Sequence, residues 1–551
     1  MAIQIDKRER PVRYRKLATA VAVLCLGNSL LGSKPLFADD NNNNSKIRHV
    51  LVISIDGMHS LDLALWVKNN PNSALGQLSA HGMTYTNAST TKPSDSIPST
   101  VGIFTGGTPA VGGMYYDDAY NRAWFAPTNL TCTGTPGAVI DLKQGINLAL
   151  DGSTGVDPAK MPRRILNGTC VPVLPHDMIR VNTVFEVVKA AHLPTAYSEK
   201  RPAYDFLNGP SGKGVDDLYT PEIACYPFTP PATCNNALLS ISTTQAFDEL
   251  RVVSVLNEID GKDHTGAKRV ATPALFGMNF QAVNAAKKDS LLPIISGYAD
   301  DYSTPNADLA GAIAYVDGAI GRMVSELAAQ RLTDSTAIII TAKHGETSLD
   351  PSKRFVESTS AIQKQLNLAG VPGVPAPPAA APLIAKLTEK STAFIWLTDQ
   401  TKTRAVTDVL TTASNETILN IAQILSGESL KLLFPDPLSD PAPPDVVMVP
   451  NPGTTFEPAV QVLAEHGGFN ENDTHVPLLV SYSRTAAPGL LRAPVTTSQI
   501  APTVLTLLGL DPSKLQAVKL EGTKVLPGIP TSGNQGDDQG NGHGDNHDDN
   551  H

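Results

Sequence analysis

The chain contains a short run of consecutive hydrophobic residues that ends abruptly in an aspartate. Residues 50–55 are apolar apart from Ser54, and Asp56-Gly57 follows directly. Strands buried on both faces have such continuous runs, because helices cover both sides of a parallel sheet. Similar runs occur at 337–341, 446–449 and 476–480, and helical patterns lie between runs or after them, at 307–330 and 496–508. This alternation predicts an α/β fold with a mostly parallel sheet flanked by helices, and functional groups at the carboxyl ends of strands.

One long segment interrupts the alternation. Residues 115–238 are rich in Pro, Gly, Asn and Thr, and we interpret them mainly as a loop-rich insertion that frames the active site. Core elements are mixed in, since 182–191 has a helical pattern and 194–198 resembles the start of a strand. The 551-residue length and 41% hydrophobic content allow one large domain, which we expect over 48–530.

Both ends of the chain differ from its centre. Six basic residues precede the apolar run 17–26, and Ala38 is a possible cleavage site, which indicates a signal peptide over 1–38. The run is shorter than the apolar stretch of about 20 residues that a membrane-spanning helix needs. An uncleaved membrane anchor remains the alternative. We expect a disordered Asn-rich spacer at 39–47 and a disordered Asp/His/Gly-rich tail at 531–551. The sequence therefore predicts a periplasmic or secreted protein with no stable membrane span after cleavage.

Four cysteines remain after the predicted cleavage. An even number in an exported protein favours disulfides, and three connectivities are possible. The simplest pairs Cys132 with Cys170 and Cys225 with Cys234. The formal net charge is −10, and no basic stretch of the kind that binds nucleic acid is present in the expected domain.

Ser96 begins a short helical pattern that a glycine pair, Gly106-Gly107, brings to an end. The N–H groups at a helix N-terminus stabilise an anion, and they favour the deprotonated form of a serine placed there. This position makes Ser96 a candidate nucleophile. Two alternatives remain open: Ser96 caps the helix, or the nearby Ser94 is the reactive serine.

Two segments about two hundred residues apart carry metal-ligand residue types. Asp260 and His264 lie in one polar turn, and His466 lies in Glu465-His466-Gly467-Gly468. One aspartate and two histidines suit a divalent ion, zinc above all. Asp56 and His344 each follow a predicted buried strand and are further candidate ligands.

These motifs, in this order, resemble the type I phosphodiesterase/nucleotide pyrophosphatase family of the alkaline phosphatase superfamily. The resemblance implies an alkaline-phosphatase-like fold and hydrolysis of phosphodiesters or nucleotide pyrophosphates through a seryl-phosphate on Ser96. It implies two metal ions, usually zinc, each with its own set of ligands. The first set is Asp260, His264 and His466, and the second is Asp56, Ser96, His344 and an aspartate beside that histidine.

The sequence departs from the family pattern at two of these positions. Lys343 stands where the aspartate beside His344 is expected. Three outcomes are open: its ammonium replaces the charge of the second ion, its neutral amine coordinates the ion, or it binds the substrate oxyanion. The expected number of ions is therefore one or two. Ser99 replaces an asparagine that would help bind the phosphoryl oxygen.

Other roles are weaker expectations. Tyr115 and Tyr116 begin the insertion and are candidates for substrate contact, and Glu346 is a candidate ion-pair partner for Lys343. The expected partner is a small-molecule phosphate ester. Phosphomonoester, phosphonate or sulfate ester hydrolysis remains an alternative function. A non-catalytic member of the superfamily that binds a ligand is the second class of function that stays open.

Overall fold

The fold was examined in a computed structural model of the whole chain. The structure describes residues 47–530, apart from 144, 229–239, 289–296, 300–303, 350–361, 363–365, 367–382, 413–417, 457–462, 484 and 486–487. The predicted signal peptide, most of the predicted spacer and the predicted tail lie outside these residues. Among the described residues, no helix combines the length and apolarity needed to cross a bilayer.

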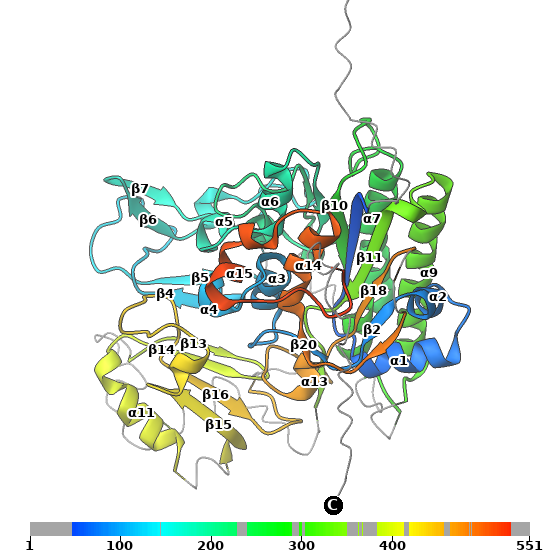
Figure 1. The fold of residues 1–551 in the computed structure, drawn as a ribbon. Coiled ribbons are helices and arrows are strands. Elements are labelled where there is room, and N and C mark those ends of the chain that lie inside the picture. The colour runs from blue at the N-terminus through cyan, green and yellow to red at the C-terminus, as the bar shows by residue number, and fades with distance from the viewer. Residues whose placement is uncertain are drawn as a thin grey trace, which may run out of the picture. The chain divides into compact units, whose positions relative to one another are not determined.

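An eight-stranded sheet forms the centre of the molecule (Figure 1). Its order is β19 (Gly489–Leu491), β2 (Met83–Tyr85), β18 (Leu478–Ser481), β11 (Thr336–Thr341), β1 (His49–Ile55), β10 (Leu275–Phe280), β8 (Ala196–Ser198) and β9 (Asp217–Tyr219). The strands from β11 to β9 are parallel to one another, and β18 is antiparallel to both of its neighbours. The predicted mostly parallel sheet is confirmed.

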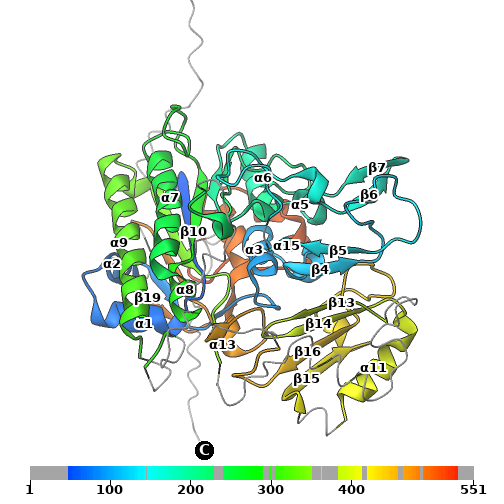
Figure 2. The ribbon, with the colours of Figure 1, turned by 180° about the vertical axis from the view of Figure 1, so that it is seen from behind.

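Alternate residues of β1 face two different hydrophobic cores. Val50 and Val52 belong to one core, and Leu51 and Ile53 belong to the other, because successive side chains of a strand point to opposite faces. The second core packs against α1 (Ser60–Asn69), α2 (Ala74–His81), α7 (Ile241–Ile259) and α9 (Ala307–Ala329). The first packs against α3 (Ser96–Thr105), α6 (Val184–Ala190) and α14 (Ile500–Leu507). Figure 2 shows the helices of the second core in front of the sheet.

A second sheet lies beside the main one and is entirely antiparallel. Its order is β13 (Ile384–Glu389), β14 (Ala393–Leu397), β16 (Val446–Pro450) and β15 (Ile421–Ser426), and α11 (Thr403–Leu410) packs on it. The apolar run 446–449 is therefore a strand, as predicted, but not a strand of the parallel sheet. The run alone does not distinguish the two, since a central strand of an antiparallel sheet can also be buried on both faces.

The predicted insertion divides into two parts. Its first part forms two hairpins, β4 (Asp118–Asn121) with β5 (Ala138–Asp141) and β6 (Arg163–Leu166) with β7 (Thr169–Pro172). A disulfide joins Cys132 to Cys170 across this part, as predicted. The second part returns to the core as α6, β8 and β9. The other predicted pair includes Cys234, which lies outside the described residues.

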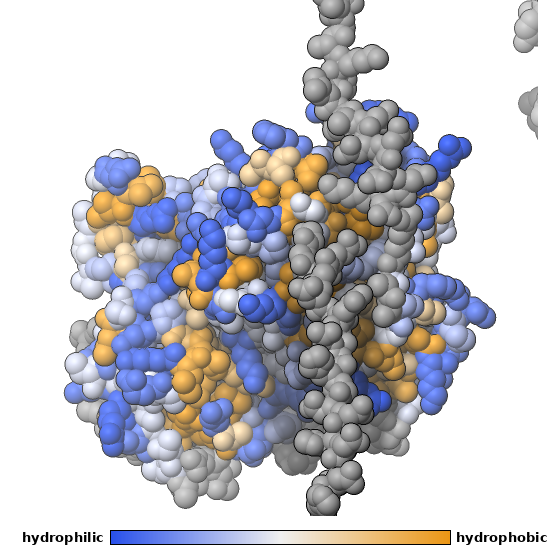
Figure 3. Space-filling view, viewed as in Figure 1, coloured by the Kyte–Doolittle hydropathy of each residue, from blue (hydrophilic) through white to orange (hydrophobic). Residues whose placement is uncertain are grey.

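The surface seen in Figure 3 mixes hydrophilic and hydrophobic side chains. Hydrophobic groups gather over part of the small antiparallel sheet, and hydrophilic groups separate the patches. Scattered apolar surface of this kind is ordinary for a folded domain. Polar residues that follow the central strands, such as Asp56 and His344, are buried instead.

Candidate active site

Ser96 is the first residue of α3, but it does not cap the helix. Asp95 is the N-cap, and its side chain accepts a hydrogen bond from the N–H of Ile97. The helix ends where Gly106 adopts a left-handed conformation with φ 80°, which suits glycine. The rival Ser94 is engaged elsewhere, because its hydroxyl donates to the carbonyl of Asp473 at 2.6 Å. The two hydroxyls therefore lie in different surroundings, and Ser96 stays the candidate nucleophile.

The Ser96 hydroxyl lies between a lysine and a histidine. Lys200 Nζ donates to Ser96 Oγ at 3.0 Å, and Nε2 of His344 lies 3.2 Å from the same oxygen. Lys200 follows β8 and His344 follows β11, so both come from carboxyl ends of parallel strands. On the other side of the ring, Nδ1 of His344 lies 2.8 Å from the carbonyl oxygen of Gly345. A carbonyl only accepts, so this contact favours a proton on Nδ1, whereas Asp56 Oδ2, at 3.5 Å from Nε2, favours a proton on Nε2. With the proton on Nδ1, the lone pair of Nε2 faces Ser96.

Asp56 follows β1 and is fully buried. Its Oδ2 accepts from Lys200 Nζ at 2.9 Å and from Gln281 Nε2 at 2.5 Å, and its Oδ1 accepts from Asn279 Nδ2 at 2.7 Å. Lys343 Nζ lies 3.3 Å from the same Oδ2. Burial by itself would raise the pKa of Asp56, but the two ammonium groups hold it well below its ordinary value.

Lys343 is held by more than Asp56. Its Nζ donates to Glu199 at 2.9 Å and to the hydroxyl of Tyr204 at 2.8 Å. The expected ion pair with Glu346 does not form, because Lys343 Nζ pairs with Asp56 and Glu199, whereas Glu346 Oε1 lies 2.9 Å from Nδ1 of His466. Glu346 joins the two histidines instead.

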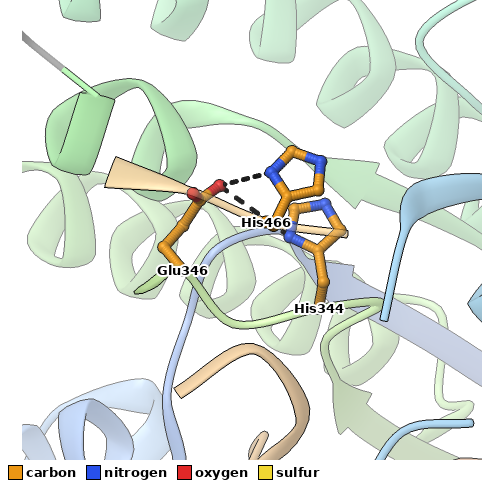
Figure 4. Close-up of side chains that lie close together, drawn as sticks. All are labelled: His344, Glu346 and His466. Carbon is orange, nitrogen blue, oxygen red and sulfur yellow. Dashed lines mark hydrogen bonds and ion pairs between the residues drawn. The ribbon is translucent and has the colours of Figure 1, made fainter. Parts of the chain in front are cut away.

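Three side chains next to Ser96 form a compact cluster (Figure 4). His466 Nδ1 lies 2.9 Å and His344 Nδ1 3.8 Å from Glu346 Oε1, and the two rings stack at 3.6 Å. The ligand-type atoms of these three residues lie within 4.8 Å of one another, so the cluster could hold one metal ion. The His344 nitrogen within 4 Å of Glu346 is Nδ1, which also lies 2.8 Å from the carbonyl oxygen of Gly345, so binding an ion through Nδ1 would break that bond.

Burial controls the ionisation of this cluster and of Lys200. It raises the pKa of Glu346 well above its ordinary value, and Lys288 only partly opposes this. It lowers the pKa of His344, against the attraction of Asp56, and it lowers the pKa of His466 well below its ordinary value. It also lowers the pKa of Lys200 to about 8, although Asp56 acts in the opposite direction.

Asp260 and His264 lie elsewhere, and their predicted place beside His466 is wrong. They follow α7 and precede β10, so they lie at the amino end of that strand, whereas Asp56 and His344 lie at carboxyl ends. Asp260 accepts from Gln330 and pairs with Lys262. His264 bonds to Asp217, the first residue of β9. The ligand-like spacing belongs to a helix-to-strand turn, and spacing does not specify the edge of the sheet.

The three residues expected to bind substrate are all buried. Ser99 lies in the first turn of α3, and its Oγ has no hydrogen-bond partner among the described residues. Tyr116 packs against the His466 loop so closely that a Cβ at Gly467 would lie 1.9 Å from its hydroxyl oxygen, which requires glycine there. Tyr115 packs on Phe434, which in turn contacts Phe394 of β14. Their contact with substrate stays a prediction.

Sequence reasoning missed several residues that surround Asp56. They are Lys200, Glu199, Asn279 and Gln281. A signal was present for all of them. Glu199 and Lys200 directly follow the strand predicted to start at 194–198, and Asn279 and Gln281 lie at the end of the apolar β10. The rule that functional groups gather at carboxyl ends of strands applies to both positions.

The sequence profile of the type I phosphodiesterase/nucleotide pyrophosphatase family matches residues 50–468. The chain belongs to this family. It is therefore a member of a family of phosphoester hydrolases, within the alkaline phosphatase superfamily. No curated protein sequence gives a significant match to the chain.

Solved structures of the superfamily have the same fold. Murine ectonucleotide pyrophosphatase/phosphodiesterase 5 gives a TM-score of 0.52 at 14% identity, with 84% of this chain and 95% of that chain covered. Its inactive variant has been solved with AMP. The alkaline phosphatase PafA gives a TM-score of 0.55 at 11% identity, with 85% and 96% covered. At these identities the likeness concerns the fold.

Proposed function

We propose that this family member is an exported hydrolase of phosphodiesters or nucleotide pyrophosphates, with Ser96 as the nucleophile. One observation carries the proposal: the Ser96 hydroxyl lies between a hydrogen-bond acceptor, His344 Nε2, and a cationic donor, Lys200 Nζ. A serine activated by an adjacent base is the usual form of a covalent hydrolase nucleophile. Export is supported by the Cys132–Cys170 disulfide, since disulfides persist in oxidising compartments.

The arrangement suits in-line attack on phosphorus. His344 Nε2 takes the proton of Ser96 as Oγ bonds to phosphorus, and the leaving oxygen departs on the far side and takes a proton from solvent. The seryl intermediate keeps the second ester group of the diester. Water then attacks its phosphorus from that side and loses a proton to solvent, which releases the monoester. As the phosphorus–Oγ bond breaks, His344 returns the proton to Ser96.

Negative charge on the phosphoryl oxygens would meet fixed positive groups. The N-terminus of α3, a helix of ten residues, lies at Ser96, so the positive end of the helix dipole is close to the reacting oxygen. The Lys200 ammonium stabilises the Ser96 alkoxide as it forms, at the position where the charge develops. In this proposal Ser99 and Tyr116 border the phosphoryl group, and Tyr115 contacts a more distant part of the substrate.

A zinc-dependent version of the proposal is supported by the His344–Glu346–His466 cluster. Two imidazoles and one carboxylate are a donor set that suits zinc, and zinc supplies charge neutralisation when bound. In this version His344, Glu346 and His466 would hold the ion, and His344 could accept a proton from Ser96 only through the ring nitrogen that does not bind the ion. The two versions therefore make different use of His344.

Ser96→Ala tests the proposal directly. We expect it to lower turnover of an aryl phosphodiester by on the order of a thousandfold or more, whereas wild-type protein quenched in acid should carry a phosphoryl group on the peptide containing Ser96. Ser94→Ala, the matched control, should retain activity. A panel of phosphodiester, nucleotide pyrophosphate, phosphomonoester and sulfate esters defines the substrate class. Unchanged diester hydrolysis by Ser96→Ala would contradict the mechanism, and binding of AMP without turnover of any ester would favour a non-catalytic role.

A further inference from the structure

The position around Asp56 is filled by protein cations. Resemblance to the family implies a divalent ion bound by Asp56, Ser96 and His344. In this chain, Lys200 Nζ contacts both Asp56 Oδ2 and Ser96 Oγ, at 2.9 and 3.0 Å. An ammonium nitrogen thus lies between the two oxygens that such an ion would bridge.

The remaining acceptor capacity of Asp56 is also used. Gln281 Nε2 and Asn279 Nδ2 donate to its two oxygens, and Lys343 Nζ approaches Oδ2 at 3.3 Å. All of these side chains are buried. A divalent ion would have to displace at least one ammonium group from a site with little room for solvent, and it would be repelled by the other. These residues do not fit a metal ion at Asp56.

Charge balance agrees with this assignment. In the site that the resemblance implies, the charge of one divalent ion and the charges of two aspartates add up to zero. Lys200 and Lys343 together carry the same positive charge, and Asp56 and Glu199 carry the same negative charge. Lys343 replaces the second aspartate, and Glu199 restores the missing carboxylate at 2.9 Å from Lys343 Nζ. The exchange keeps the site neutral, which a buried site requires.

We infer that Lys200 and Lys343 take the place of the metal ion at Asp56, so that Ser96 is activated without an ion at this position. Lys200 touches the reacting oxygen and acts as a catalytic residue. Lys343 does not touch Ser96 and is a positioning residue, which holds Asp56 and thereby Lys200. The inference rests on the proposed function for its kinetic part only, since metal binding is measured independently of activity.

The first experiment compares wild-type full-length protein before and after dialysis against a chelator. We expect zinc titration by calorimetry that folded Asp56→Asn leaves unaltered, and a loss of activity on chelation with that result would concern the histidine cluster and not the position at Asp56. Loss of activity on chelation with recovery on adding zinc, together with weaker zinc binding by Asp56→Asn, would overturn the inference. If wild-type protein hydrolyses no ester, the proposed function fails, and the zinc titrations alone decide the assignment of the lysines.

Substitution of the lysines gives the second experiment. Lys200→Met should lower kcat about a hundredfold with little change in KM, and Lys343→Met about tenfold. Lys343→Asp combined with Lys200→Met restores the family's carboxylate, removes both ammonium groups and should bind one more zinc ion per chain than wild type. Lys262→Met, which removes only the cation paired with Asp260, is the matched control and should match wild type. Equal zinc stoichiometry of the folded double variant and wild type, with Lys200→Met fully active, would contradict the assignment.

Discussion

Two Asp/His pairs of this chain lie at opposite ends of the same sheet. Asp56 and His344 follow the parallel strands β1 and β11, are buried, and lie within 3.5 Å of each other beside Ser96. Asp260 and His264 precede β10, are partly exposed, and bind Lys262 and Asp217. The residue types are the same, but only the carboxyl end concentrates side chains from several strands in one buried place. Residue type and spacing therefore indicate a site only when the strand direction is known.

The largest expected difference between the two ends is in activity. His344→Asn removes the acceptor that faces Ser96, and we expect phosphodiester turnover to fall by about 10²- to 10⁴-fold, the usual contribution of a general base. His264→Asn makes the equivalent change at the amino end and should leave turnover within about twofold of wild type, since the side chain of this histidine bonds to Asp217 and stacks on Tyr219. Steady-state kinetics of the two purified variants measures both effects. A large loss in His264→Asn would mean that the amino end takes part in catalysis.

A second difference concerns stability. Asp56→Asn leaves Lys200 and Lys343 without their shared counter-charge in a buried site, and we expect it to lower the free energy of unfolding by about 3 kcal/mol or more. Asp260→Asn removes an exposed ion pair and should leave the unfolding midpoint unchanged. Urea unfolding followed by circular dichroism compares the two variants. Equal unfolding midpoints of the two variants would show that the charge of Asp56 does not stabilise its contacts with Lys200 and Lys343.

The smallest expected effect is a pH dependence of thermal stability that comes from His264, at the amino ends of the parallel strands. The hydrogen bond to Asp217 raises the pKa of His264, with burial opposing it. A histidine with a raised folded-state pKa contributes stability that is complete below its unfolded pKa of about 6.5 and is lost as pH rises through the folded value. Asp217→Asn should therefore reduce the fall in thermal midpoint between about pH 6 and pH 9. Parallel midpoint curves for wild type and Asp217→Asn would refute this pairing in solution.

Much of the fold followed from local pattern. The runs at 50–55 and 337–341 are central parallel strands, and Ser96 begins a helix that ends at a glycine pair, as their sequences indicate. The run 446–449 is a strand of a separate antiparallel sheet, which its composition does not reveal. Continuous burial is common to both kinds of strand, whereas pairing partners are long-range contacts.

The candidate site was predictable wherever a residue directly follows a recognised strand. Asp56 and His344 satisfy this condition, and both lie beside Ser96 in the structure. Lys200 also lies just after a strand indicated by the sequence, at 194–198, but a lysine does not match a ligand motif, whereas Asp260 and His264 do. Gln281 follows β10, which is not among the strands predicted from the sequence. A motif search favours residues that could bind an ion, and therefore misses residues that replace one.

The sequence by itself determined the family, the strands and helices of the core, and the serine at a helix N-terminus, because each depends on neighbouring residues. Only the tertiary structure decided which charged groups meet at Asp56. That meeting depends on the order of strands in the sheet, which brings Lys200 from β8 and Lys343 from β11 to the same oxygen of one carboxylate. Electrostatic interaction in a buried site acts over a few ångströms of space and is independent of separation along the chain.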